Sequence, residues 1–315
     1  MLFRSAIRAK RLFEHETGKH HLDFSNAYKA SFFEYFQEVT DQKAAGSKSN
    51  HSIWISALKH LRQYHKLPEL TFEEVDQLFL EGFRHYLMHK ARTKSGTPLS
   101  RNTQSAYFNK LRAALNQAEQ DRLLPDNPVR RVKAIQGEKN KRVYLTEDEV
   151  RALAQAECRY DVLKRAFLFS CCTGLRWSDI HQLTWAELEP FYGHYRIVFI
   201  QKKTSGLQYL DLNDMAMQLM GRSGKTSERI FKGLKYSAWH NMELTRWALQ
   251  AGITKKVTFH SARHSFAVIQ LNRGVDIYAL SRLLGHSELR TTEIYADILE
   301  SRRRDAMLDF PNVLE

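Results

Sequence analysis

The residues whose types could do chemistry gather in four short segments of the second half of the chain. Their order matters more than any one of them: 173–179 (TGLRWSD), 201–206 (QKKTSG), 260–265 (HSARHS), and 284–286 (LGH) followed by 291–295 (TTEIY). Arginine, lysine and histidine bind phosphate oxygens, and tyrosine can act as a nucleophile. The combination suits attack on a phosphodiester.

Such an attack needs several cations at once. It forms a pentacoordinate phosphorus with extra negative charge on the non-bridging oxygens, so fixed donors stabilise the transition state more than the ground state. One preorganised donor supplies about 3 to 4 kcal/mol, whereas slow phosphate chemistry needs on the order of 20 kcal/mol. Two arginines, a lysine and two histidines would form such a set.

A tyrosine nucleophile sets its own requirements. Its hydroxyl has a pKa of about 10, so a base or nearby cations must help it to react at neutral pH. A phosphotyrosine keeps the energy of the broken bond, so religation needs neither ATP nor another cofactor. We expect no metal either, because no ligand cluster of the expected spacing is visible in the sequence.

The four segments, in this order, resemble the tyrosine recombinase or phage integrase family, especially its members from mobile elements of Bacteroidetes-like bacteria. The resemblance is specific over about residues 146 to 300 and only architectural over the N-terminal half. It implies a supporting acidic residue at Asp179. It also implies six catalytic residues, of which the arginines bind phosphate and the tyrosine attacks it: Arg176, Lys203, His260, Arg263, His286 and Tyr295.

The general acid could be either of two neighbouring lysines. The family places this lysine on a β-hairpin, and Lys203, directly before Thr204, matches that place best. Lys202 is the alternative. If both stand on a strand, alternation puts them on opposite faces, so only one can point into the site.

The composition indicates a polyanionic partner. The 315 residues include 48 Lys and Arg against 35 Asp and Glu, a net charge of +13 that suits nucleic acid or an acidic membrane surface. No apolar run is long enough to span a bilayer, and the basic start has no continuous apolar core of a secretion signal. Three cysteines without disulfide or metal spacing suit a reducing cytoplasm.

The first half predicts a helical bundle, with apolar residues recurring every four positions and a cap at Ser100. We expect a basic arm or first helix over 1–20, a helical SAM-like core-binding domain over 21–128, and a basic linker over 129–145. The linker could track a DNA backbone or be a solvated hinge. With Lys202, its cations form the predicted DNA contacts: Arg130, Arg131, Lys133, Lys139, Lys141 and Arg142.

The second half predicts an α+β catalytic domain over 146–300, followed by a tail over 301–315 that could contact a neighbouring subunit. Thr146 and Glu149 match a capping box, and a buried helix should end at Gly174. The β-rich stretches 195–201 and 208–212 flank Gly206 and suggest a hairpin. The fold expected is mainly α with a small β-hairpin or sheet.

The function expected is site-specific DNA recombination. The resemblance implies strand cleavage and rejoining through a 3′-phosphotyrosine, for integration, excision or inversion. Double-stranded DNA would be the partner of a homotetramer on paired sites, with accessory DNA-bending proteins, in the cytoplasm and associated with the nucleoid. The alternatives are a type IB-like topoisomerase, a catalytically inactive DNA-binding regulator of the same fold, or an RNA-binding or membrane-surface protein explained by charge alone.

Overall fold

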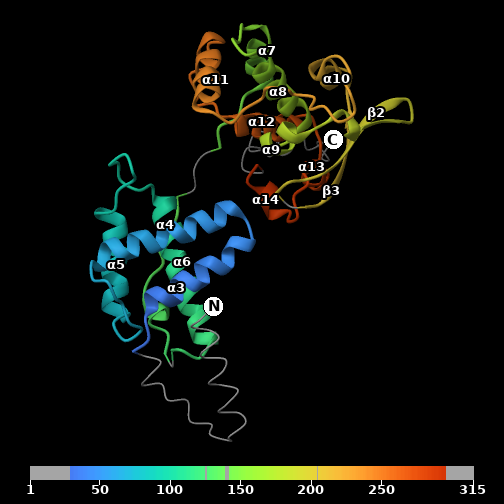
Figure 1. Cartoon of the computed structure of the whole chain (residues 1–315). Helices are drawn as coiled ribbons and strands as arrows, with labels where there is room; N and C mark the ends of the chain where they lie inside the picture. The colour runs from blue at the N-terminus through green and yellow to red at the C-terminus, as the bar shows by residue number, and fades with distance from the viewer. Residues whose placement is uncertain (1–28, 125, 139–141, 204, 296–315) are drawn as a thin grey trace, which may run out of the picture. The chain divides into compact units, whose positions relative to one another are not determined.

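The computed structural model describes residues 29–124, 126–138, 142–203 and 205–295, in two compact units, Met1–Asn140 and Lys141–Glu315 (Figure 1). Several predictions lie outside the described residues: the arm over 1–20, the tail over 301–315, and the linker cations Lys139 and Lys141.

The first unit is helical. The elements in its described residues are α3 (Phe32–Gln42), η1 (Lys43–Ala45), α4 (Lys48–His65), α5 (Gln77–His89), α6 (Arg101–Gln120) and η2 (Pro128–Arg131). Side-chain caps start three of the helices, because the Ser31, Asp76 and Ser100 oxygens accept hydrogen bonds from backbone N–H groups of the first turn. The predicted cap at Ser100 is thus confirmed.

An aromatic and aliphatic core holds these helices together. Phe32 and Phe36 of α3 are fully buried, and the Phe36 ring lies 5.4 Å from that of Trp54 on α4. Three apolar residues of the predicted linker, Val129, Val132 and Ile135, also belong to this core. The first half of that basic stretch therefore packs onto the N-terminal unit.

The described part of the second unit combines helices with a small sheet. Its elements are α7 (Glu147–Gln155), α8 (Asp161–Thr173), α9 (Trp177–Gln182), η3 (Trp185–Glu187), β1 (Leu188–Phe191), β2 (His194–Ile200), β3 (Leu207–Leu212), α10 (Asp214–Met220), α11 (Ala238–Gln250), α12 (Phe259–Asn272), α13 (Ile277–Leu283) and α14 (Arg290–Glu293). The mainly helical fold with a small sheet is as predicted.

Local signals set several of these boundaries. Thr146 and Glu149 form the predicted capping box at the start of α7. The buried helix α8 ends at Gly174, whose φ of 71° is the left-handed conformation that glycine adopts without strain. The hairpin around Gly206 is also confirmed, because β2 pairs antiparallel with β3, from Tyr195↔Leu212 to Ile200↔Leu207. A third strand, β1, pairs with the other edge of β2.

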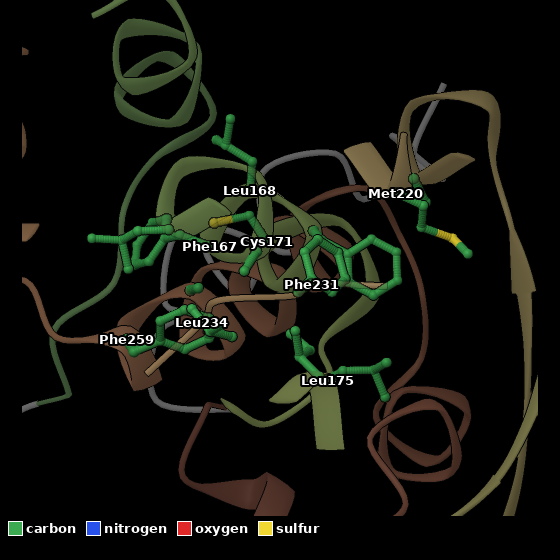
Figure 2. Close-up of a cluster of buried hydrophobic side chains, with 14 of the residues drawn as sticks. Phe167, Leu168, Cys171, Leu175, Met220, Phe231, Leu234 and Phe259 are labelled. Atoms are coloured by element: carbon green, nitrogen blue, oxygen red, sulfur yellow. The ribbon is translucent and has the colours of Figure 1, made fainter. Parts of the chain in front are cut away.

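The core of the second unit forms around α8, which packs against α10 and α12. Figure 2 shows Phe167, Leu168 and Cys171 of α8 in this cluster, together with Phe231, Leu234 and Phe259 from later segments. Helix α12 is buried along most of its length. A polar side chain on this helix is therefore held in place by packing on several sides.

None of the helices in the described ranges is both long enough and apolar enough to cross a membrane.

Candidate active site

Arg263 joins two of the four sequence segments. It lies on α12 and is only 2% exposed. Its Nη1 donates to the carbonyl of Gly174 at 2.8 Å, and its Nη2 donates to the carbonyl of Leu284 at 2.8 Å. Burial, together with the charge of Arg176, lowers the pKa of Arg263 to about 9, so the guanidinium remains cationic at neutral pH.

Arg176 stands at the N-cap position of α9, two residues after Gly174 ends α8. Its Nη1 donates to Gln201 Oε1 at 2.9 Å, and the same Gln201 donates from Nε2 to the Leu284 carbonyl at 3.3 Å. Leu284 O is thus shared with Arg263. Gln201 therefore connects the two arginines through side-chain and backbone contacts, a role that its place in the sequence did not predict.

Asp179 ties α9 to the turn of the hairpin. Its Oδ1 accepts a hydrogen bond from the backbone N–H of Lys202 at 3.1 Å. Its buried Oδ2 has no hydrogen-bond partner among the described residues, and Arg176 Nη1 lies 3.9 Å away. The carboxylate thus holds the lysine-bearing turn and places a negative charge beside Arg176.

The two lysines lie in a turn, which corrects the argument from strand alternation. Strand β2 ends at Ile200 and β3 begins at Leu207, so neither Lys202 nor Lys203 is in a strand. The chain leaves the ladder at Gln201, whose N–H bonds to the Gly206 carbonyl at 2.9 Å. The period of two that places neighbouring side chains on opposite faces does not apply there.

The electrostatics distinguish the two lysines. The charge of Lys203 is among the causes that lower the pKa values of His260 and His286. The charge of Lys202 lowers the pKa of His181 instead. Lys203 is therefore the lysine whose charge reaches the predicted catalytic histidines.

His286 connects Arg263 to the segment that carries Tyr295. Its Nε2 lies 2.9 Å from Arg263 Nη2, and its Nδ1 lies 2.7 Å from Thr292 Oγ1. Because a guanidinium can only donate, Nε2 is the acceptor and Nδ1 carries the proton. Burial, then the charges of Arg263 and Arg176, lower the pKa of His286 to about 4, so the ring is neutral at pH 7.

His260 lies in the first turn of α12, exposed on its outer side. Burial of part of the ring and the charges of Arg263 and Arg142 lower its pKa to about 4. Its ring packs edge-on against that of His264, with centroids 4.5 Å apart.

Tyr295 is buried, with 2% of its surface exposed. Its hydroxyl lies 2.6 Å from Nδ1 of His264, which was not among the site residues predicted from the sequence. Burial raises the pKa of Tyr295, whereas the charges of Arg263, Arg142 and Arg176 act in the opposite direction. The phenol thus lies close enough to both predicted phosphate-binding arginines for their charges to lower its pKa.

The predicted DNA contacts are found in different settings. Arg142 acts on the pKa values of His260, His264 and Tyr295, so its charge lies near the site. Arg130 pairs with Glu119 at 2.7 Å and Arg131 with Asp126 at 2.6 Å, both within the first unit. Lys133 and Lys202 are exposed.

Comparisons with known proteins agree with this architecture. Residues 31–135 match the Phage integrase SAM-like domain, and residues 143–302 match the Phage integrase family. Tyrosine recombinase XerD of Shewanella oneidensis is 26% identical over 279 residues, which cover 81% of this chain and 87% of the relative. Tyrosine recombinase XerC of Pelotomaculum thermopropionicum is 28% identical over 242 residues, 70% of this chain and 77% of the relative.

Solved structures show the same fold. The XerH site-specific recombinase bound to a palindromic difH substrate aligns with a TM-score of 0.65 at 16% identity, over 87% of this chain and 84% of that one. A lambda integrase (75–356) dimer bound to a COC′ core site aligns with a TM-score of 0.66 at 18% identity, over 84% and 95%. The chain therefore belongs to the phage integrase family, the tyrosine recombinases, which break and rejoin DNA.

Proposed function

We propose that this chain cleaves one DNA strand at a time with Tyr295, leaving a 3′-phosphotyrosine and a free 5′-hydroxyl. One arrangement carries the proposal: the Tyr295 hydroxyl lies 2.6 Å from His264, which directly follows Arg263 on α12. Arg176 is linked to the same place, because it donates to Gln201, and Gln201 and Arg263 both donate to the Leu284 carbonyl. A nucleophile and two phosphate-binding groups that share one small space suit attack on a bound phosphodiester.

The arginines would hold the non-bridging oxygens of the scissile phosphate. Arg263 has five N–H donors, and its contacts with Gly174, Leu284 and His286 use three of them. Its Nε–H and one Nη1–H make no hydrogen bond to the described residues, so they are available for a phosphate. The contacts that bury Arg263 fix the direction of the fork before the substrate binds, which lowers the reorganisation needed in the transition state.

The histidines would be further hydrogen-bond donors to the scissile phosphate, beside the two arginines. In the structure His286 presents a lone pair at Nε2 to Arg263, so it must carry a proton at Nε2 when it donates to a phosphate oxygen. Thr292 can support both forms, because its hydroxyl can accept from Nδ1–H or donate to an unprotonated Nδ1. His260, exposed at the start of α12, would donate to the same phosphate.

Lys203 would give its proton to the leaving 5′ oxygen. The supporting observation is that its charge acts on both His260 and His286, and Asp179 fixes the turn through the neighbouring Lys202 N–H. Cleavage then forms the bond between Tyr295 Oη and phosphorus and breaks the bond from phosphorus to the 5′ oxygen. The phenol proton passes to water, and Lys203, which has given its proton to the 5′ oxygen, regains one from water. Religation reverses these steps.

The wider assembly is part of the proposal. Two duplexes, four copies of the chain and a Holliday-junction intermediate would complete recombination, with DNA-bending proteins as accessory partners. Both units would contact the duplex, and the basic residues near the unit boundary would contribute phosphate contacts. The Bacteroidetes mobile-element subtype, a nucleoid-associated cytoplasmic location, and the choice among integration, excision and inversion remain predictions.

The test is a trapped covalent adduct. A DNA duplex is first selected for binding from a randomised pool, and a nick is then moved through it base by base, so that a short 5′-hydroxyl fragment can diffuse away after cleavage. The wild-type chain should form an adduct that survives a denaturing gel on at least one of these nicked duplexes.

Two variants complete this test. Tyr295→Phe should abolish the adduct and bind the selected duplex with nearly unchanged affinity. Arg176→Ala should slow adduct formation far more than it weakens binding. An adduct that persists in Tyr295→Phe, or a wild-type chain that binds but never forms one, would reject the proposed function.

A further inference from the structure

The hydrogen bond between Tyr295 and His264 links the nucleophile to the helix that binds phosphate. The phenol oxygen lies 2.6 Å from His264 Nδ1, and both side chains are buried. A buried tyrosine hydroxyl normally finds a hydrogen-bond partner. Among the described residues, His264 is the side chain that meets this need.

The proton in this hydrogen bond belongs to the tyrosine. Burial, together with the charges of His260, Arg142, Arg263 and His286, lowers the pKa of His264 to about 3, so the ring is neutral and can offer a lone pair. Burial also raises the pKa of Tyr295, so the phenol keeps its proton in the free protein. The phenol O–H therefore donates to Nδ1, and the imidazole carries its own proton on Nε2.

This donation fixes the rotation of the phenol O–H. When the proton points at His264, the oxygen lone pairs point elsewhere, and one of them is free to face an incoming phosphorus. In-line displacement needs such an aligned lone pair, and a misplacement of about 1 Å can cost about 100-fold in rate. The histidine thus orients the attacking atom without touching the substrate.

The position of His264 in the sequence explains why it suits this task. It follows Arg263 directly on α12, a helix that is buried along most of its length. The neighbouring segment is held at a second point, because Thr292 contacts His286, which contacts Arg263. Helix α12 therefore fixes both the guanidinium of Arg263, which would bind the phosphate, and, through His264, the Tyr295 hydroxyl that attacks it.

We propose that His264 is a positioning residue for strand cleavage, whose Nδ1 accepts the hydrogen bond of the Tyr295 hydroxyl and holds its oxygen ready for in-line attack. The proposal rests on the proposed function of Tyr295. It assigns to His264 the role of a fixed hydrogen-bond acceptor and not that of a base that stores the proton, which passes on to water as Oη bonds to phosphorus.

Two substitutions separate the acceptor from the ring. His264→Phe keeps an aromatic ring in the packed interior but has no acceptor. His264→Asn can place an amide oxygen where Nδ1 stands, so it retains an acceptor that does not take up a proton near neutral pH. Ser265→Ala is the matched control, because it removes a buried hydrogen bond to Leu145 N from the next position of α12 without touching Tyr295.

The measurement is the single-turnover rate of adduct formation on the trapping duplex, with DNA affinity and thermal unfolding recorded for each variant. We expect His264→Phe to be about 100-fold slower than the wild type at saturating DNA, and His264→Asn to stay within about 10-fold. Affinity should change by less than about threefold in both, as expected when only the reacting geometry is lost. Ser265→Ala should unfold at a lower temperature and retain its cleavage rate.

The pH profile gives an independent readout. An acceptor that stays neutral leaves the shape of the rate profile between about pH 6 and 9 the same in His264→Asn as in the wild type. The positioning role would be overturned if His264→Phe cleaved at the wild-type rate, or if His264→Asn were as slow as His264→Phe. It would also be overturned if the pH–rate profile of His264→Asn lacked the acidic or the basic decline seen in the wild type. An adduct that persists in Tyr295→Phe would instead reject the proposed function itself.

Discussion

At the scale of single residues, Lys203 carries the least constrained role in the site. Asp179 fixes the turn through the backbone of Lys202, and the Lys203 side chain is exposed. Its assignment depends on where its charge acts, namely on His260 and His286. A chemical test is therefore needed, because exposure allows the ammonium group several positions.

A sulfur leaving group supplies that test. An alkoxide needs a proton to depart, whereas a thiol with a pKa of about 8.5 leaves readily without one. We predict that Lys203→Ala slows cleavage of ordinary DNA by about 100-fold or more, and that a duplex with sulfur in place of the 5′-bridging oxygen restores the rate to within about 10-fold. Lys202→Ala is the control and should cleave both duplexes normally. If the sulfur-containing duplex restored the cleavage rate of Lys202→Ala and not that of Lys203→Ala, Lys202 would be the general acid.

The neutral state of His264 also predicts an acid-sensitive fold. Its folded pKa of about 3 lies below the usual value, so below about pH 6.5 the unfolded chain binds a proton that the folded chain does not. The stability that His264 contributes is complete above that pH and is lost as pH falls. Between pH 7 and 5 the wild type should lose about 2 kcal/mol more unfolding free energy than His264→Asn. Urea unfolding at both pH values measures this, and equal losses would contradict it.

At the scale of elements, the corner between α8 and α9 positions the site. Gly174 ends α8 with a φ of 71°, and its carbonyl accepts a hydrogen bond from Arg263. A Cβ at this position would lie 2.6 Å from Cδ1 of Phe266. The glycine is therefore needed both for its backbone conformation and for the close approach of α12.

A pair of glycine substitutions separates these two needs. Gly193 has a φ of 82°, and a Cβ added there would meet nothing within 4 Å, so Gly193→Ala should cost only the backbone strain, about 1 to 2 kcal/mol. Gly174→Ala adds the collision with Phe266 and should cost about 2 to 5 kcal/mol. It should also slow cleavage of bound DNA, because the acceptor of Arg263 moves. Thermal unfolding and adduct rates measure both effects, and equal results for the two variants would contradict this account.

How much could be predicted at this scale depended on how local the signal was. The capping box of Thr146, the stop at Gly174 and the hairpin around Gly206 each arise from residues a few positions apart, and each was found in the sequence. The contacts of Arg176 with Gln201 and of His264 with Tyr295 join residues 25 and 31 positions apart. These contacts depend on how α9, α12 and the segment that carries Tyr295 pack against one another. The spacing of apolar residues along the sequence predicts each helix but not this packing.

The lysine turn shows the same limit within one hairpin. The residue types indicated two strands, but they did not indicate that the ladder ends at Ile200. One or two residues at a strand end decide whether side-chain alternation applies. The sequence thus identified both lysines. The folded chain distinguishes them, because the charge of Lys203 lowers the pKa of His260 and the charge of Lys202 lowers the pKa of His181.

At the scale of the whole molecule, charge and architecture fit one partner. The net charge of +13 is spread over two compact units, each with its own hydrophobic core. Many of the surface arginines are already paired with carboxylates, as Arg151 is with Glu147 at 2.6 Å. Net charge alone therefore does not say which cations meet phosphate.

Salt dependence identifies such cations. Binding of the selected duplex should weaken steeply with potassium chloride concentration, because each phosphate contact releases counterions. Arg142→Gln should reduce the slope of log affinity against log salt by about one unit, since its charge acts on the site residues. Arg151→Gln should leave the slope unchanged. Equal slopes for wild type and Arg142→Gln would remove Arg142 from the DNA interface.

The central claim is that the Tyr295 hydroxyl becomes bonded to phosphorus. Trypsin cuts after Arg290 and Arg302, so the trapped adduct should yield the peptide 291–302 joined through Tyr295 to the 3′ end of the cleaved strand. Fragmentation in a mass spectrometer should locate the phosphate on that tyrosine, with a free 5′-hydroxyl on the released strand. A phosphate on any other residue, or cleaved DNA with a free 3′-phosphate and no attached peptide at any time point, would contradict the account.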